Sequence, residues 1–122
     1  MGTVHRSAGD WRWEGVPARA YESGAERHTI IGPTDGARDC ELRYFRIPAG
    51  GASALESHEH EHAILIVHGR AMVRLGDRDE SVGPGDAVFV ASLELHQLTP
   101  IGDEDLGFLC TARANRAPGP SA

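Results

Sequence analysis

The chain has 122 residues, of which 40% are hydrophobic and 25% are charged, and its formal net charge is −6. This length suits one domain with a single core, and an acidic chain without a basic cluster argues against nucleic acid or an anionic membrane surface as a partner. The sequence has no apolar run near the roughly 20 residues that span a bilayer, and its first residues lack the apolar stretch of a signal peptide, so we expect a cytoplasmic protein.

The predicted elements are short strands separated by turns. Residues 1–26 are polar and irregular and form an N-terminal arm, and residues 27–114 form the folded domain. No segment shows a sustained helical period, and regularly spaced turns rich in glycine and proline indicate a β-sandwich or barrel. Residues 115–122 are rich in Pro, Gly and Ser and are expected to be disordered. The strands that we expect are 27–31, 40–47, 64–67, 71–75, 87–91, 96–99 and 106–111.

The stretch of 50–69 concentrates groups that bind metals. Glu56, His58, His60 and His62 occupy alternate positions, which share one face of a strand. Imidazole and carboxylate groups suit divalent Mn, Fe, Ni, Co, Cu or Zn, and this mixed set does not choose among them. The competing interpretation is a solvated, charged turn. His96, after a later turn and strand, supports a metal site only if the fold brings it close.

This stretch resembles the first motif of the cupin family. That motif has a glycine, five residues, His-x-His, three or four residues, Glu, six residues and a second glycine. Counted from Gly50, the spacing puts Glu56 at the first His position, His58 at the second, His62 at the Glu position and Gly69 at the end. All the spacings fit the motif, but the Glu and one His have exchanged places: Glu56 stands where the motif has His, and His62 stands where it has Glu.

A second stretch is similar to the second cupin motif, which has Pro-x-Gly and a following His. The matching residues run from the turn at 83–86 to His96. Ser92 and Glu94 replace the usual Pro and Gly, and Pro100 stands where Asn is common. The resemblance covers about residues 27–112 and implies an all-β fold, the cupin jelly-roll barrel.

The resemblance implies one divalent transition metal per chain. Its ligands would be Glu56, His58, His62 and His96, which keep the family's set of three imidazoles and one carboxylate in a permuted order. A second ligand set replaces Glu56 with His60, and we rank it lower because the family's spacer would place His60 at a turn, away from the barrel interior. In a third arrangement three histidines bind the metal and Glu56 acts as a catalytic base beside them.

We predict a metal-dependent enzyme, specifically a dioxygenase-like oxidoreductase that acts on a small organic molecule. Isomerisation or decarboxylation by Lewis acidity is an alternative, and so is a non-catalytic binding or sensing cupin. Cys110, near a redox-active metal, would be prone to oxidation. Cys110 and Cys40 are expected to be reduced.

The arm and the first expected strand bear on assembly. Trp11 and Trp13, with the strand at 27–31, would suit a strand exchanged between two subunits. We therefore expect a homodimer that binds a small molecule.

Overall fold

The computed structural model describes residues 1–114. Within them the regular elements are strands, apart from one short 3-10 turn, η1 (Pro33–Asp35). The prediction of an all-β chain is confirmed. The strands are β1 (Ser7–Gly9), β2 (Arg12–Trp13), β3 (Ala18–Ala20), β4 (Glu26–Ile31), β5 (Glu41–Ile47), β6 (His62–His68), β7 (Arg70–Leu75), β8 (Arg78–Val82), β9 (Ala87–Val90), β10 (His96–Ile101) and β11 (Leu106–Ala112).

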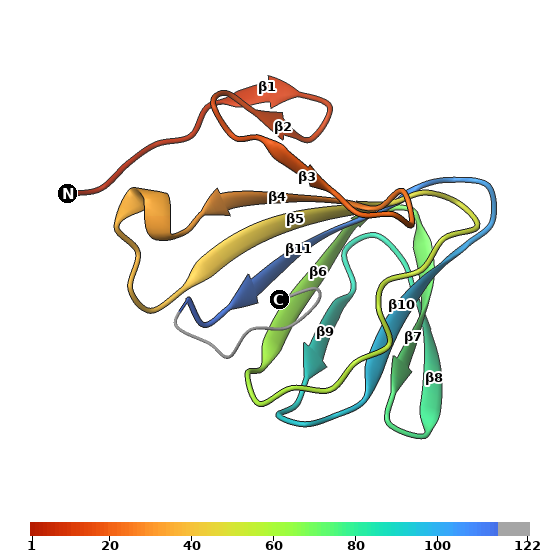
Figure 1. Ribbon diagram of the computed structural model, residues 1–122. Helices are drawn as coiled ribbons and strands as arrows, with labels where there is room; N and C mark the ends of the chain where they lie inside the picture. The colour runs from red at the N-terminus through yellow and green to blue at the C-terminus, as the bar shows by residue number, and fades with distance from the viewer. Residues whose placement is uncertain (115–122) are drawn as a thin grey trace.

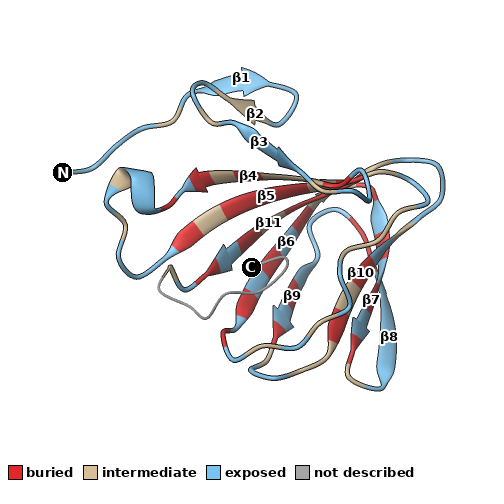
Figure 2. Cartoon of the chain, viewed as in Figure 1, coloured by how far each residue is buried: buried red, intermediate tan, exposed pale blue. Residues whose placement is uncertain are grey.

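Two antiparallel sheets enclose the core in a jelly-roll arrangement (Figure 1). The larger sheet has the order β3-β4-β5-β11-β6-β9, and the smaller has the order β10-β7-β8. Buried and exposed residues alternate along the strands of both sheets (Figure 2). In β6, for example, His62, Ile64 and Ile66 are buried while Ala63 and Leu65 are exposed. This period of two places the inward row of each strand inside the barrel.

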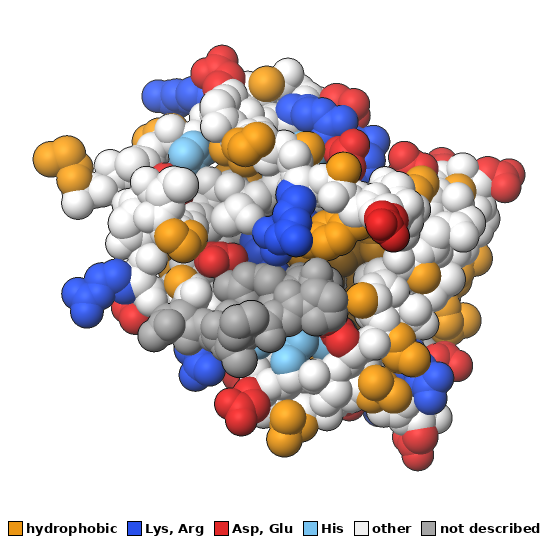
Figure 3. All heavy atoms as spheres, in the orientation of Figure 1, with side chains coloured by type: hydrophobic (Ala, Val, Ile, Leu, Met, Phe, Trp, Pro, Cys, Tyr) orange, Lys and Arg blue, Asp and Glu red, His pale blue; other side chains and the backbone are white. Residues whose placement is uncertain are grey.

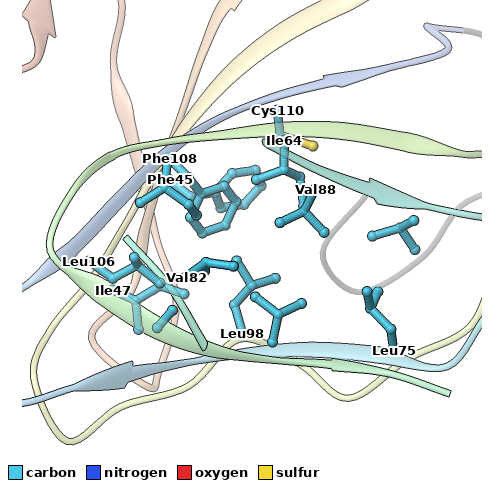
Figure 4. Packing of buried hydrophobic residues seen from close by; sticks show 14 of the residues in the cluster. Phe45, Ile47, Ile64, Leu75, Val82, Val88, Leu98, Leu106, Phe108 and Cys110 are labelled. Carbon is cyan, nitrogen blue, oxygen red and sulfur yellow. The ribbon is translucent and has the colours of Figure 1, made fainter. Parts of the chain in front are cut away.

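The core lies between the sheets (Figure 4). Phe45 of β5 and Phe108 of β11 stack with their ring centroids 5.1 Å apart. Leu98 of β10, in the smaller sheet, and Cys110 of β11, in the larger sheet, belong to the same buried cluster. Offset aromatic pairs of this kind add to the stabilisation that burial provides.

The prediction that residues 1–26 are irregular is wrong. They form the β1–β2 hairpin and the edge strand β3, which pairs with β4. Trp11, at the tip of the hairpin, stacks on Tyr44 with ring centroids 5.6 Å apart, and Trp13 contacts the same ring. In the single chain the arm therefore covers the outer face of its own sheet, while exchange with a second subunit stays a prediction.

Other differences concern the smaller sheet and the ends of the chain. β8 was missed because four of its five residues are exposed and give no apolar alternation.

Cys40 and Cys110 are free, as predicted. Among residues 1–114 no helix is long and apolar enough to cross a membrane. The prediction of a disordered tail concerns residues 115–122, which lie outside the described residues.

Asp35 ties the start of the arm to the domain. Its Oδ1 accepts a hydrogen bond from Thr3 at 2.7 Å and contacts His5 Nε2 at 2.6 Å, and its Oδ2 accepts one from the Gly32 amide at 2.9 Å. The bond from Thr3, then those from Gly32 and His5, lower the pKa of Asp35 to about 2. The contribution to stability is therefore complete above the ordinary pKa of 3.8 and is lost as the pH falls through about 2.

We expect Asp35→Asn to release the first residues of the arm. Hydrogen-exchange protection of the Glu14 amide, which donates to the Arg6 carbonyl at 2.9 Å within the arm, should fall in the variant, since a neutral amide accepts weaker hydrogen bonds from Thr3 and His5 than a carboxylate does. In the wild type the same protection should fall between about pH 5 and about pH 2. Asp39→Asn, at an exposed position nearby, is the matched control. Unchanged protection in Asp35→Asn would show that this carboxylate does not hold the arm.

Candidate metal centre

Two separate stretches bring the predicted ligands together. Glu56 and His58 lie in the connection before β6, His62 begins β6, and His96 begins β10. Glu56 and His96 form an isolated β-bridge, in which the Glu56 amide donates to the His96 carbonyl at 3.1 Å and the His96 amide donates back at 2.9 Å. This bridge brings the first residue of β10 next to the histidine-rich connection.

The ligand atoms of three histidines lie within 4.8 Å of one another. These are His58, His62 and His96, and the condition that the fold must bring His96 close is met. The Nδ1 atoms of His58 and His96 each lie 2.9 Å from a backbone carbonyl, those of His60 and Glu94. A carbonyl can only accept, so each Nδ1 carries the proton and each Nε2 keeps its lone pair for a cation.

Glu56 lies at the edge of this group. Its Oε1 is 3.6 Å from His58 Nε2 and 3.9 Å from His96 Nε2, and its side chain is 8% exposed. A carboxylate at this position is close enough to serve as a fourth ligand or as a base next to the three imidazoles.

The far side of the His62 ring contacts a buried arginine and a thiol. His62 Nδ1 lies 3.3 Å from Nη2 of Arg43 and 3.1 Å from Sγ of Cys110, and Arg43 Nη2 donates to that sulfur at 3.3 Å. Burial lowers the pKa of His62 to about 3, and the positive charge of Arg43 is the next cause. The ring is therefore neutral near pH 7. Arg43 was not predicted from the sequence as part of the site. It could have been found as a charged residue at an inward-facing position of the alternating strand β5.

His60 differs from its prediction. It was expected at a turn away from the barrel interior, yet it is buried at 4% exposure and stacks on His58 with ring centroids 3.7 Å apart. Its neighbours Glu59 and Glu61 are exposed. His60 is not among the three histidines whose ligand atoms converge. The choice between Glu56 and His60 as the fourth ligand stays a prediction.

Two other histidines lie on the outer face of the larger sheet, under the arm. His68 is partly exposed, and its ring contacts the Tyr44 hydroxyl at 2.5 Å and the Asp105 carbonyl at 3.1 Å. His28 is buried at 1% exposure. Both rings pack in the aromatic cluster around Tyr44 and lie outside the group of converging histidines.

The converging residues fit one divalent transition metal. His58 Nε2 and His62 Nε2 are 3.1 Å apart. Two nitrogen ligands about 2.1 Å from one ion, at a right angle, would lie about 3.0 Å apart. Neutral imidazoles with a carboxylate are a common donor set for such ions, and the set does not select one of them.

Cavities reach the histidines from two sides. His62, His96 and Glu56 line a small cavity. It shares Phe45, Ser53 and Ala54 with a neighbouring, largely apolar cavity of about 310 Å³. On the other side of His62 lies a wider hollow of about 560 Å³. Figure 3 shows histidine side chains next to acidic ones in the lower part of the face that it displays. The acidic residues lining the wider hollow are Asp39, Glu59 and Glu61.

Three histidines and a carboxylate converge on the inner face of this jelly roll. The chain is therefore a small β-barrel protein with residues suited to one metal ion. A family model described as a cupin domain matches residues 43–112. This chain belongs to the cupin family.

Its relatives include named enzymes and solved cupin structures. A 1-methylthio-D-xylulose 5-phosphate methylsulfurylase from Rhodospirillum rubrum is 37% identical over 112 residues, which cover 87% of this chain and 71% of the relative. A conserved-barrel cupin from Rhodopseudomonas palustris is 31% identical with a TM-score of 0.85, over 95% of this chain and 83% of that one. A polyketide cyclase from Streptomyces resistomycificus is 29% identical with a TM-score of 0.80, over 97% of this chain and 82% of the cyclase.

Proposed function

We propose that this protein is a metal-dependent enzyme that acts on a small carbonyl compound without net oxidation. The observation that carries the proposal is the placement of Glu56 Oε1 at 3.6 Å and 3.9 Å from two of the three converging imidazoles. A divalent cation held by His58, His62 and His96 would supply Lewis acidity toward a carbonyl oxygen of the substrate.

The residues of the chain provide the proton transfer that such chemistry needs. Glu56 is close enough to the histidines to take a proton from the carbon next to the carbonyl group, and it can return that proton to the same or another atom of the product. The side chain is nearly buried, which keeps bulk water from competing for the proton. Arg43 and Cys110 hold the far side of His62 and orient its ring.

The names of the relatives support carbonyl chemistry. The Rhodospirillum rubrum relative is named for a substituted xylulose phosphate, and xylulose is a ketose. The Streptomyces relative is named a polyketide cyclase, and polyketides carry several carbonyl groups. Neither name specifies an oxygenase.

The dioxygenase activity predicted from the sequence is the second candidate, because the same donor set suits iron and manganese. We rank it lower on one observation. Cys110 Sγ lies 3.1 Å from the ring of His62, where a thiol would be exposed to oxidation by any activated oxygen species. A site that works without dioxygen avoids this damage.

The proposal predicts that Glu56→Gln stops exchange of the carbon-bound protons of a hydroxyketone. Wild-type protein loaded with manganese or zinc, incubated with dihydroxyacetone phosphate in deuterated water, should exchange these protons, as followed by proton NMR. The variant should exchange them about a hundredfold to ten-thousandfold more slowly, because an amide cannot take a proton. Metal content is measured in parallel, so that loss of the base is separated from loss of the ion.

Glu61→Gln is the matched control, since Glu61 is exposed on the same connection. Equal exchange in wild type and Glu56→Gln would exclude Glu56 as the base. Dioxygen uptake in proportion to substrate consumed would favour the oxygenase instead. Binding of the ketone with neither exchange nor dioxygen uptake would favour a non-catalytic binding protein.

A further inference from the structure

Two arginines face each other across neighbouring strands of the larger sheet. Arg19 of β3 pairs directly with Arg27 of β4, and Arg27 in turn pairs with Phe45 of β5, whose side chain belongs to the core. Directly paired residues share one face of a sheet, so both arginines are on the same face as Phe45. Arg27 is partly buried there, whereas Arg19, on the edge strand β3, is exposed and lies over the ring of Tyr21 at 5.3 Å. Like charges at such a pair destabilise the sheet, and the fold therefore tolerates an unfavourable arrangement here.

Neither arginine is neutralised by a carboxylate of the described chain. Arg12, Arg46 and Arg78 each form an ion pair with a carboxylate, whereas no ion pair of Arg19 or Arg27 occurs within residues 1–114. The Nε atom of Arg27 is buried and has no hydrogen-bond partner in the described part of the chain, and the same holds for the hydroxyl of Tyr21. The chain has 18 acidic and 12 basic residues, so a shortage of carboxylates does not explain these unused donors.

Two other arginines, Arg19 and Arg43, act on Arg27. Burial lowers the pKa of Arg27, and the charges of Arg19 and Arg43 act in the same direction, while Tyr21 and Glu41 oppose them. A guanidinium group stays charged in a protein despite such a shift. An anion placed next to Arg27 would relieve the repulsion among these arginines.

Arg27 lines neither the cavity of about 310 Å³ nor the histidine cavity, but Phe45, its strand partner, lines both. The guanidinium of Arg43 contacts His62 at 3.3 Å and lies over the ring of Phe45 at 5.2 Å. Tyr21 and Phe45 both line the cavity of about 310 Å³, which adjoins the histidine cavity. The wider hollow on the other side of His62 is lined by three carboxylates and one arginine, Arg113, and is therefore less suited to an anion.

We infer that Arg27, with Arg19 opposite it, binds an anionic group of the substrate, a phosphate monoester or a carboxylate, while the rest of the molecule extends past Phe45 to the histidines. The planar guanidinium fork is suited to two oxygen atoms of such a group, and the Tyr21 hydroxyl is a further donor. The part of the inference that concerns the histidines rests on the proposed function, whereas the anion site itself does not.

The test is a calorimetric titration of the full-length protein with inorganic phosphate and with acetate, once with its metal and once after chelation. We expect phosphate to bind wild type in both states and to bind Arg27→Gln about tenfold to hundredfold more weakly. Arg78→Gln is the matched control, because Arg78 is an exposed arginine of β8 and should leave binding unchanged. Tighter binding of acetate than of phosphate would assign the site to a carboxylate.

A stability measurement separates binding from a structural role. If Arg27 serves the anion, Arg27→Gln should unfold at the same temperature as wild type or higher without phosphate, since it removes the repulsion from Arg19. A lower midpoint together with unchanged phosphate binding would overturn the inference, and so would a wild type that binds neither anion. Phosphate binding is also measured after chelation, so the anion site is tested without the metal. Failure of the proton-exchange experiment would therefore not affect the conclusion about Arg27.

Discussion

His96→Ala is expected to abolish stoichiometric metal binding. His96 begins β10 and supplies one of three imidazoles whose ligand atoms lie within 4.8 Å of one another. Removing one of three or four ligands should lower affinity by about a hundredfold or more, because the remaining groups cannot complete the coordination of the ion. Untagged protein reconstituted with manganese or zinc and analysed by elemental mass spectrometry should hold near one ion per chain in wild type and close to none in the variant.

Three further variants identify the ligands. Glu56→Ala should lose the metal if the carboxylate is the fourth ligand, and His60→Ala should retain it, because His60 stacks beside His58 rather than converging with the others. His5→Ala is the control for loss of a histidine elsewhere, since His5 contacts Asp35 in the arm. Retention of metal by His96→Ala, or loss in His60→Ala alone, would show that the site is built differently.

The grouping of the ligands could be predicted because the spacing of the cupin motifs was recognised, and His96 follows the turn at 83–86 in both the motif and the structure. The alternation expected for 56–62 is wrong, because Glu56, His58 and His60 lie in the connection before β6 and only His62 begins the strand. The turn at 83–86 forms as expected, with Oδ2 of Asp86 accepting a hydrogen bond from the Gly83 amide at 2.8 Å. Local spacing and turn chemistry were sufficient for this part of the site.

The parts that could not be predicted depend on contacts between distant segments. The burial of His60 follows from stacking on His58 within the connection, and nothing in the run of charged residues indicates it. The pairing of Arg19 with Arg27 depends on the register of the hairpin formed by β3 and β4. Like charges opposite each other run against general expectations for a sheet, so the sequence offered no reason to place them there.

The arm shows the same limit. Its tip, Asp10 and Trp11, has positive φ at both residues, a conformation that suits Asp, Asn or Gly but not Trp. Stacking of Trp11 on Tyr44 holds the hairpin against the sheet, and a sequence without visible strand alternation could not indicate that contact. Tertiary packing decided the structure of this segment.

Gly69→Ala is expected to destabilise the domain by about 3 kcal/mol or more. Gly69 joins β6 to β7 with φ +74°, which an alanine adopts only with strain of about 1–2 kcal/mol. A Cβ there would also lie 2.3 Å from the carbonyl oxygen of Asp105, a backbone atom that cannot rotate away. The free energy of unfolding in urea measures the loss, and in the motif this glycine ends the segment that begins at Gly50.

Gly102→Ala separates the two causes. Gly102 has a similar φ of +85°, but nothing lies within 4 Å of its would-be Cβ, so only the conformational cost of about 1–2 kcal/mol should remain. Because Gly69 directly follows β6, whose first residue is His62, displacement of the strand in Gly69→Ala should also weaken metal binding, whereas Gly102→Ala should not. Equal losses of stability in the two variants would mean that the contact with Asp105 relaxes without cost. In that case the close packing at Gly69 does not position β6.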